Sequence, residues 1–212
     1  MIYKNFLPDS RSGFLPMPLE RVPAGAIFDC DGTLANTMPL HYRAWRMVLG
    51  DLGCPFPEEQ FYALGGVSAI EILEQLNREH GLSLPPRHTA EIKEAVFATL
   101  LPDCDGIEPV IAEARRLHGL CPLAVASGGL KLVVEQTLDL LGIRDLFQTI
   151  ATAEDVPHGK PAPDMFLLCA ERLGADPKAC VVFEDGPVGF VGAHAAGMQV
   201  VDVRRFTNSP AR

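Results

Sequence analysis

Short apolar runs alternate with helical patterns along most of this chain, and this alternation is the feature that most constrains its fold. Five runs have the length of buried strands: residues 24–28, 122–126, 148–151, 180–183 and 199–203. Four segments with apolar residues at helical spacing separate them: residues 107–118, 131–141, 164–173 and 188–196. In the third segment we expect Asp164 to be the N-cap and Gly174 to end the helix. Because strands that alternate with helices form parallel sheets covered on both faces, the sequence predicts an α/β fold.

Residues 38–105 interrupt this alternation with helical patterns and no strand between them. The residues at helical spacing are His41, Trp45, Val48, Leu49 and Leu52; Ala69, Ile72, Leu73 and Leu76; and Ile92, Ala95, Val96 and Leu100. We predict an all-helical cap domain over 38–105, inserted after the first strand of a core made of 23–37 and 106–212. Prolines without periodicity predict that residues 1–22 are a loose N-terminal extension.

Charge and cysteine usage exclude several classes of protein. The 212 residues carry a net charge of −9 without any basic run, which excludes nucleic acid and anionic membranes as expected partners. No signal peptide or membrane-spanning stretch is evident, and none of the six cysteines form a C-x-x-C pair. We therefore expect a cytoplasmic protein with reduced, buried thiols, acting as a monomer or weak homodimer.

Polar side chains follow the predicted strands where each one ends. They are Asp29 and Asp31 after the first, Ser127 and Gly128 after the second, Lys160 in the loop after the third, and Glu184 and Asp185 after the fourth. Because ligands of open parallel sheets bind beyond the carboxyl ends of the strands, we expect these groups to converge.

Four carboxylates in one place repel one another unless a cation is present, and a hard divalent ion such as Mg²⁺ suits oxygen ligands. A metal, a lysine, a hydroxyl and glycine amides together make a receptacle for a phosphoryl group. Asp29 is placed to attack phosphorus, and Asp31 to protonate the leaving oxygen.

Each of these signals has a simpler interpretation when it is taken alone. Asp-x-Asp-Gly occurs in turns and calcium loops, Ser127 is a possible cap for the following helix, and Lys160 a possible solvated loop residue. Glu184 and Asp185 are compatible with a plain acidic turn. Their joint occurrence in order, each after an apolar run, favours the catalytic interpretation.

The same residues resemble the motifs of a known superfamily. Residues 28–34, Phe-Asp-Cys-Asp-Gly-Thr-Leu, resemble the first motif of the haloacid dehalogenase superfamily, and Ser127, Lys160 and Glu184-Asp185 match its other three. The resemblance spans about residues 25–203 and implies a Rossmann-like core with a four-helix cap. Residues 41–45 and 66–68 are similar to the branch that contains β-phosphoglucomutases and small sugar phosphatases, and 160–170 and 181–198 to bacterial fructose-1-phosphate phosphatases.

This resemblance implies a role for each carboxylate. Asp29 would be the phosphorylated nucleophile, and Asp31 the acid that later activates water. Mg²⁺ would be held by Asp29, the backbone carbonyl of Asp31 and Asp185, with Glu184 in or near the coordination sphere. The second aspartate, Asp31, disfavours the dehalogenase branch, which lacks it.

The resemblance also implies that Ser127, Gly128 and Lys160 bind the phosphoryl oxygens. We therefore predict a Mg²⁺-dependent phosphatase that hydrolyses a small phosphorylated metabolite, such as fructose 1-phosphate or 6-phosphogluconate, through an aspartyl-phosphate. A β-phosphoglucomutase is the alternative, although the arginine that follows Gly-Val-Ser in the cap loop of similar mutases is Ala69 here. Lys93 can take the place of this arginine only if the helix that carries Lys93 faces the core. A binding module without activity would not need both aspartates.

Overall fold

A five-stranded parallel sheet forms the centre of the larger lobe, as the alternating pattern predicts. The computed structural model of the protein describes residues 14–65 and 67–206. The strands are β1 (Gly25–Phe28), β2 (Leu123–Ser127), β3 (Thr149–Thr152), β4 (Cys180–Glu184) and β5 (Gln199–Asp202). Their order is β3-β2-β1-β4-β5, and every neighbouring pair is parallel.

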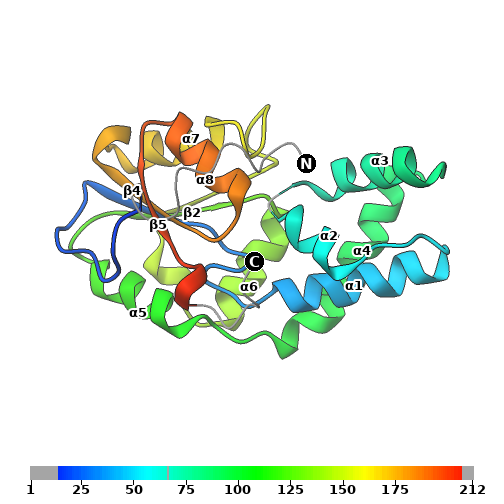
Figure 1. Ribbon diagram of the computed structural model, residues 1–212. Coiled ribbons are helices and arrows are strands. Elements are labelled where there is room, and N and C mark those ends of the chain that lie inside the picture. Colours follow the sequence, from blue (N-terminus) through cyan, green and yellow to red (C-terminus); the bar gives the residue numbers. More distant parts are fainter. Residues whose placement is uncertain (1–13, 66, 207–212) are drawn as a thin grey trace.

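Helices cover both faces of this sheet (Figure 1). They are α5 (Glu108–Leu117), α6 (Lys131–Leu140), α7 (Asp164–Leu173) and α8 (Pro187–Ala195). Because successive strand residues point to opposite faces, Phe28 packs with α5 and α6, whereas Ile27 packs with α7 and α8. Short 3₁₀ turns occupy Leu101–Asp103, Arg144–Leu146, Pro177–Ala179 and Arg204–Phe206.

The two predicted ends of α7 have different outcomes. Gly174 ends the helix in the left-handed conformation with φ 65°, which confirms that prediction. The assignment of Asp164 as N-cap is wrong, because the cap position is Pro163 and Asp164 is the first helical residue. Asp164 still places a negative charge in the first turn, where the helix dipole favours it.

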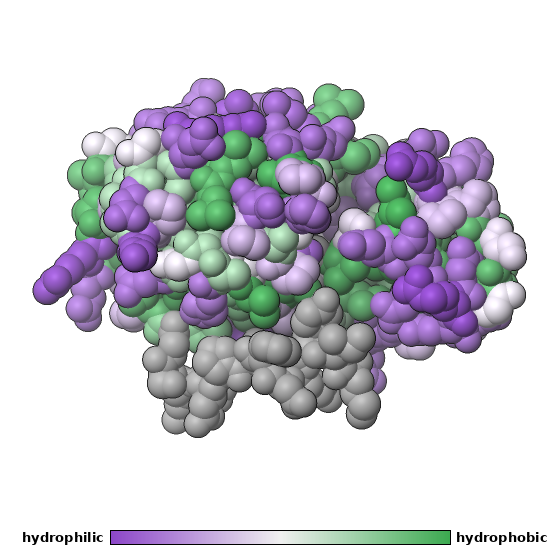
Figure 2. Space-filling model, turned by 90° about the horizontal axis from the view of Figure 1, so that it is seen from above, coloured by the Kyte–Doolittle hydropathy of each residue, from purple (hydrophilic) through white to green (hydrophobic). Residues whose placement is uncertain are grey.

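Four consecutive helices form a second lobe, which we call the cap. They are α1 (Met38–Asp51), α2 (Glu58–Ala63), α3 (Ala69–His80) and α4 (Pro86–Leu100), and Figure 1 places them together at one end of the molecule. The visible surface of this lobe is mostly hydrophilic (Figure 2). Its interior is a separate hydrophobic cluster that contains Trp45, Phe61 and Leu73. With six residues, α2 is too short for helical spacing to reveal.

The apolar face predicted for the last cap helix is partly wrong. Ile92 is 42% exposed and Ala95 is also exposed, whereas Lys93, Phe97 and Leu100 are buried. The buried positions follow i, i+4, i+7 spacing, but one of them is a lysine. A prediction from hydrophobicity alone therefore chooses the neighbouring face of this helix as the buried one.

The N-terminal segment is not loose over the residues that the structure describes. The amide of Leu15 donates to the carbonyl of Val200 on β5 at 2.8 Å, and Phe14 bridges the same strand. Leu19 is buried, and its amide donates to the carboxylate of Glu113 on α5 at 2.9 Å. The prediction of a loose extension is therefore wrong for residues 14–22, while residues 1–13 lie outside the described part of the chain.

The thiols agree with the expectation from the sequence. All six cysteines are free, and all except Cys121 are buried.

Within residues 14–65 and 67–206, none of the helices has the length and apolar character needed to cross a membrane.

Candidate active site

Two strand ends and a tight turn position the acidic residues. Asp29 directly follows β1, and its amide donates to the carbonyl of Phe183 on the neighbouring strand β4 at 2.9 Å. Gly32 has φ +90°, and a Cβ atom there would lie 2.5 Å from a carboxylate oxygen of Asp185. Glycine is therefore required in this turn both by its conformation and by the close approach of Asp185.

Lys160 lies at the centre of the acidic group rather than in solvent. Its Nζ atom is 2.6 Å from Oδ1 of Asp29 and 2.7 Å from Oε2 of Glu184, and all three side chains are buried. Burial alone would lower the pKa of Lys160, but Asp29 and Glu184 hold it well above its ordinary value. Lys160 therefore keeps its proton and its positive charge.

Glu184, the last residue of β4, is held by hydrogen bonds on both of its carboxylate oxygens. Its Oε1 atom accepts hydrogen bonds from the amides of Asp185 at 3.1 Å and Gly186 at 3.0 Å, while Oε2 accepts from Lys160. The helix makes room for it at Gly189, where a Cβ atom would lie only 2.0 Å from Oε2 of Glu184.

Three carboxylates lie close enough together to hold a cation. One oxygen each of Asp29, Glu184 and Asp185 falls within a group whose members are at most 4.8 Å apart. Burial and the nearby Glu184 raise the pKa of Asp29 well above its ordinary value, because Lys160 offsets only part of the negative charge. A buried, all-oxygen donor set with excess negative charge fits a hard divalent cation.

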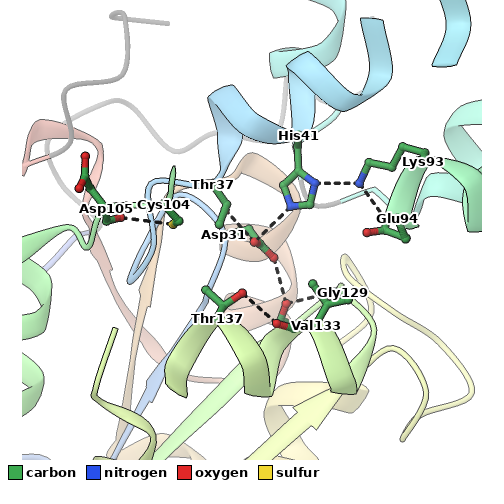
Figure 3. Close-up of polar contacts among 11 residues, drawn as sticks. Asp31, Thr37, His41, Lys93, Glu94, Cys104, Asp105, Gly129, Val133 and Thr137 are labelled. Carbon is green, nitrogen blue, oxygen red and sulfur yellow. Dashed lines mark hydrogen bonds and ion pairs between the residues drawn. The ribbon is translucent and has the colours of Figure 1, made fainter. Parts of the chain in front are cut away.

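The carboxylate of Asp31 has a different set of partners, which Figure 3 shows. Oδ1 accepts from the hydroxyl of Thr37 at 2.7 Å and lies 3.3 Å from Nε2 of His41, while Oδ2 accepts from the hydroxyl of Ser127 at 3.3 Å. Burial alone would raise the pKa of Asp31, but the hydrogen bonds from His41 and Thr37 hold it below its ordinary value. Its carboxylate is not a member of the three-residue group, so a metal contact through its backbone carbonyl stays a prediction.

Ser127 does not cap the following helix. The N-cap of α6 is Leu130, and the Ser127 hydroxyl instead accepts from the amide of Gly129 at 3.1 Å while donating to Asp31. Ser127 and the two glycines after it therefore lie beside the acidic group.

A second polar chain joins Asp31 to the cap. Nζ of Lys93, on α4, lies 2.7 Å from Nδ1 of His41 and 2.8 Å from Oε1 of Glu94 (Figure 3). Because Nδ1 of His41 accepts a hydrogen bond from the ammonium of Lys93, the single N–H proton of the imidazole ring sits on Nε2 and points to Asp31. Burial and Lys93 both lower the pKa of His41, which keeps the ring neutral.

A pocket between the core and the cap opens onto these groups. It encloses about 110 Å³. Its lining includes Asp29, Asp31, Gly128, Gly129, Glu184 and Asp185 from the core, and His41, Trp45, Phe61, Leu64, Val67, Ser68, Ala69, Ile72, Lys93 and Glu94 from the cap. Gly66, which belongs to the predicted cap loop, lies outside the described residues.

The structure thus brings all the predicted site residues to one place, and adds some that the sequence did not reveal. Thr37 and Glu94 are absent from the prediction, and His41 enters it only as a position of the helical pattern. No pattern marked them, because their positions depend on how the cap meets the core.

The fold and the site define a capped α/β enzyme whose strand ends carry a buried acidic centre with the donor atoms for a cation. Residues 23–197 match the haloacid dehalogenase-like hydrolases, and the chain belongs to this family.

The chain is also similar to characterised members of the family. It is 42% identical to fructose-1-phosphate phosphatase YqaB of Escherichia coli K12, over 85% of this chain and 96% of the relative. It is 31% identical to a phosphorylated carbohydrates phosphatase of Thermotoga maritima, over 82% and 81% of the two chains. A crystal structure of β-phosphoglucomutase from Clostridium difficile matches with a TM-score of 0.74 and 26% identity, over 85% and 84% of the chains.

Proposed function

We propose that this protein is a Mg²⁺-dependent phosphatase that hydrolyses a small sugar monophosphate through an aspartyl-phosphate on Asp29. The observation that carries the proposal is the contact of Lys160 with Asp29 at 2.6 Å, beside Glu184, Asp185 and a second aspartate, and all four carboxylates line a small pocket. The characterised relatives act on phosphorylated sugars, which supports this substrate class.

In the first step, an oxygen of Asp29 forms a bond to phosphorus while the bond from phosphorus to the sugar oxygen breaks. Asp31 gives its proton to the departing sugar oxygen, so that an alcohol leaves. In the second step, Asp31 takes a proton from water, which attacks the phosphorus and releases inorganic phosphate and the free carboxylate of Asp29.

Asp31 must change its protonation state between these two steps. Its hydrogen bonds with His41 and Thr37 favour the carboxylate, which is the form that accepts a proton from water. A phosphate dianion bound next to Asp31 has the opposite effect, because a like charge raises the pKa of a carboxyl group. Substrate binding therefore favours the acid, and transfer of its proton to the departing sugar oxygen leaves Asp31 as the base for the second step.

Three groups hold the transferring phosphoryl group in this proposal: Lys160, the Ser127 hydroxyl and the Gly128 backbone. Asp29, Glu184 and Asp185 would hold Mg²⁺, together with the backbone carbonyl of Asp31. When bound, the ion offsets the negative charge of the carboxylates and of the phosphate, so that the carboxylate of Asp29 can approach the phosphate. The cap excludes bulk water from the pocket while the phosphoryl group is transferred.

The test is phosphate release from a panel of sugar phosphates, with and without Mg²⁺. We expect release that requires Mg²⁺ and is absent in Asp29→Asn, because the amide is a poor nucleophile of similar shape. The exposed Asp139→Asn on α6 is the matched control and should keep wild-type activity. Release by Asp29→Asn at a tenth of the wild-type rate would exclude Asp29 as the nucleophile.

The similarity to β-phosphoglucomutase makes an isomerase the second candidate. A mutase must hold the second phosphate of a bisphosphate intermediate against the cap, where arginine is best suited to do so. Ala69 occupies the position of that arginine, and the pocket-lining Lys93 is already paired with Glu94. With β-glucose 1-phosphate and a glucose bisphosphate activator, we expect phosphate release to outrun formation of glucose 6-phosphate. The reverse order would make the protein a mutase.

A further inference from the structure

The cap side of the pocket has little positive charge to offer a ligand. Among the described residues that line the pocket, Lys93 is the only lysine or arginine. The cap arginines Arg43 and Arg46 are exposed on α1 and do not line it. Any second anionic group on a substrate would therefore depend on Lys93 alone.

The charge of Lys93 is already balanced within the protein. Its side chain is only 5% exposed, and its Nζ atom contacts Oε1 of Glu94 at 2.8 Å and Nδ1 of His41 at 2.7 Å. Two of the three ammonium protons are thus used, and the adjacent carboxylate cancels the positive charge. Glu94 itself lines the pocket and is 20% exposed, so a ligand meets this carboxylate beside the lysine.

Most of the remaining cap lining is apolar. Trp45, Phe61, Leu64, Val67 and Ile72 surround the space beyond the acidic group. A carboxylate or second phosphate placed there would lose its hydration without gaining a cation, which is costly in an apolar setting. Hydroxyl groups cost less to bury, and a carboxylate such as that of Glu94 accepts their hydrogen bonds.

We propose that Glu94 is a specificity-determining residue, which selects sugar monophosphates whose far end is uncharged over those that carry a second anionic group. The inference rests on the proposed phosphatase function and adds the substrate class of the same site. Glu94 acts by neutralising Lys93, which leaves the cap side of the pocket without a net positive charge for a second anion.

A matched pair of substrates isolates this effect. Sorbitol 6-phosphate and 6-phosphogluconate have the same six-carbon chain and phosphate, and differ only in a CH₂OH or a carboxylate at C1. We expect wild-type kcat/KM to be at least about tenfold higher for sorbitol 6-phosphate, because a carboxylate on the apolar cap side of the pocket loses its hydration without gaining a cation. Both assays use saturating Mg²⁺.

Glu94→Gln should reduce this preference to a factor of about three or less, because it removes the charge that neutralises Lys93 and frees Lys93 to bind an anion. The ratio of the two kcat/KM values is the readout, since any general damage to catalysis affects both substrates equally. Glu91→Gln is the control, because Glu91 lies on the same helix with a side chain 77% exposed and outside the pocket. Glu94→Asp keeps the charge and should keep the preference.

Equal kcat/KM values for the two substrates in the wild type would overturn the inference without recourse to any variant. A preference that Glu94→Gln leaves unchanged, or that Glu91→Gln removes to the same extent, would also overturn it. Release of phosphate from p-nitrophenyl phosphate but from neither sugar would refute the substrate class alone. Failure to release phosphate from any of the three would instead refute the proposed phosphatase function.

Discussion

The contact between Gly189 and Glu184 gives a sharp test of how the acidic centre is supported. Replacing Gly189 by alanine places a Cβ atom 2.0 Å from Oε2 and 2.1 Å from Cδ of Glu184, far inside van der Waals contact. One of the two groups must move. The Glu184 side chain is the group that moves, since rotation about its own bonds displaces it, whereas α8 is anchored through the buried Val188 and Phe190.

Moving Glu184 breaks its 2.7 Å contact with Lys160, which is buried. Breaking a buried ion pair typically costs about 3–5 kcal/mol, and alanine returns about 1 kcal/mol through its higher helix propensity. We therefore expect Gly189→Ala to lower the free energy of unfolding by about 2–4 kcal/mol. For a chain of this size, that corresponds to a fall in Tm of roughly 5–15 °C.

The assay is thermal unfolding of the metal-free protein, followed by a Mg²⁺ titration of phosphatase activity. We expect half-maximal activity to need more Mg²⁺, because Glu184 belongs to the proposed ligand group. Gly50→Ala is the matched control, since Gly50 lies in α1 with nothing within 4 Å of the added Cβ atom. It should leave Tm unchanged or slightly raised. A Tm for Gly189→Ala within about 2 °C of the wild type, with unchanged Mg²⁺ dependence, would refute the reasoning.

Three further predictions address the charges of the site and its surroundings. Asp29→Asn should not lower the Tm of the metal-free protein, because burial and neighbouring carboxylates already raise the pKa of Asp29; a large fall in Tm would contradict this. EDTA should abolish activity and Mg²⁺ restore it, and Asp185→Ala should raise the Mg²⁺ requirement at least about tenfold, as a titration of activity would measure. Glu113→Gln should lower the free energy of unfolding at neutral pH by about 1–2 kcal/mol, because the charged carboxylate accepts hydrogen bonds from Leu19 and Arg116. Although burial alone would raise the pKa of Glu113, these hydrogen bonds lower it in the folded protein, so its contribution is present above the ordinary value of 4.5 and is lost as the pH falls through the lowered value. Urea denaturation should therefore show a difference that shrinks in acid, and a constant difference would contradict the assignment.

The sheet was predictable because its signals are local. Each strand is a short apolar run, and the polar residue that ends it, such as Asp29 or Glu184, marks the same edge in every case. Parallel pairing then brings distant residues together without further information, as the contact of Lys160 with Asp29 shows.

The cap was less predictable because its contacts are specific to one packing arrangement. Lys93 occupies a buried position that apolar residues usually take, so the pattern on α4 pointed to Ile92 instead. The pairing of Lys93 with His41 joins two helices far apart in sequence, and a single sequence carries no signal for it. Residues 14–22 contain prolines and show no periodic pattern, so the sequence does not predict the contacts of Leu15 and Leu19 either.

The placement of Phe14 and Leu15 along β5 has a consequence for the sheet as a whole. As the last strand in the order, β5 presents backbone groups on its outer side, and the amide of Leu15 satisfies the carbonyl of Val200 there. An uncovered edge strand is a template onto which another chain can add. A chain shortened to begin at Val22 would keep every group of the acidic centre yet uncover this edge. Loss of the segment before Val22 would therefore cause self-association at high concentration rather than slower catalysis.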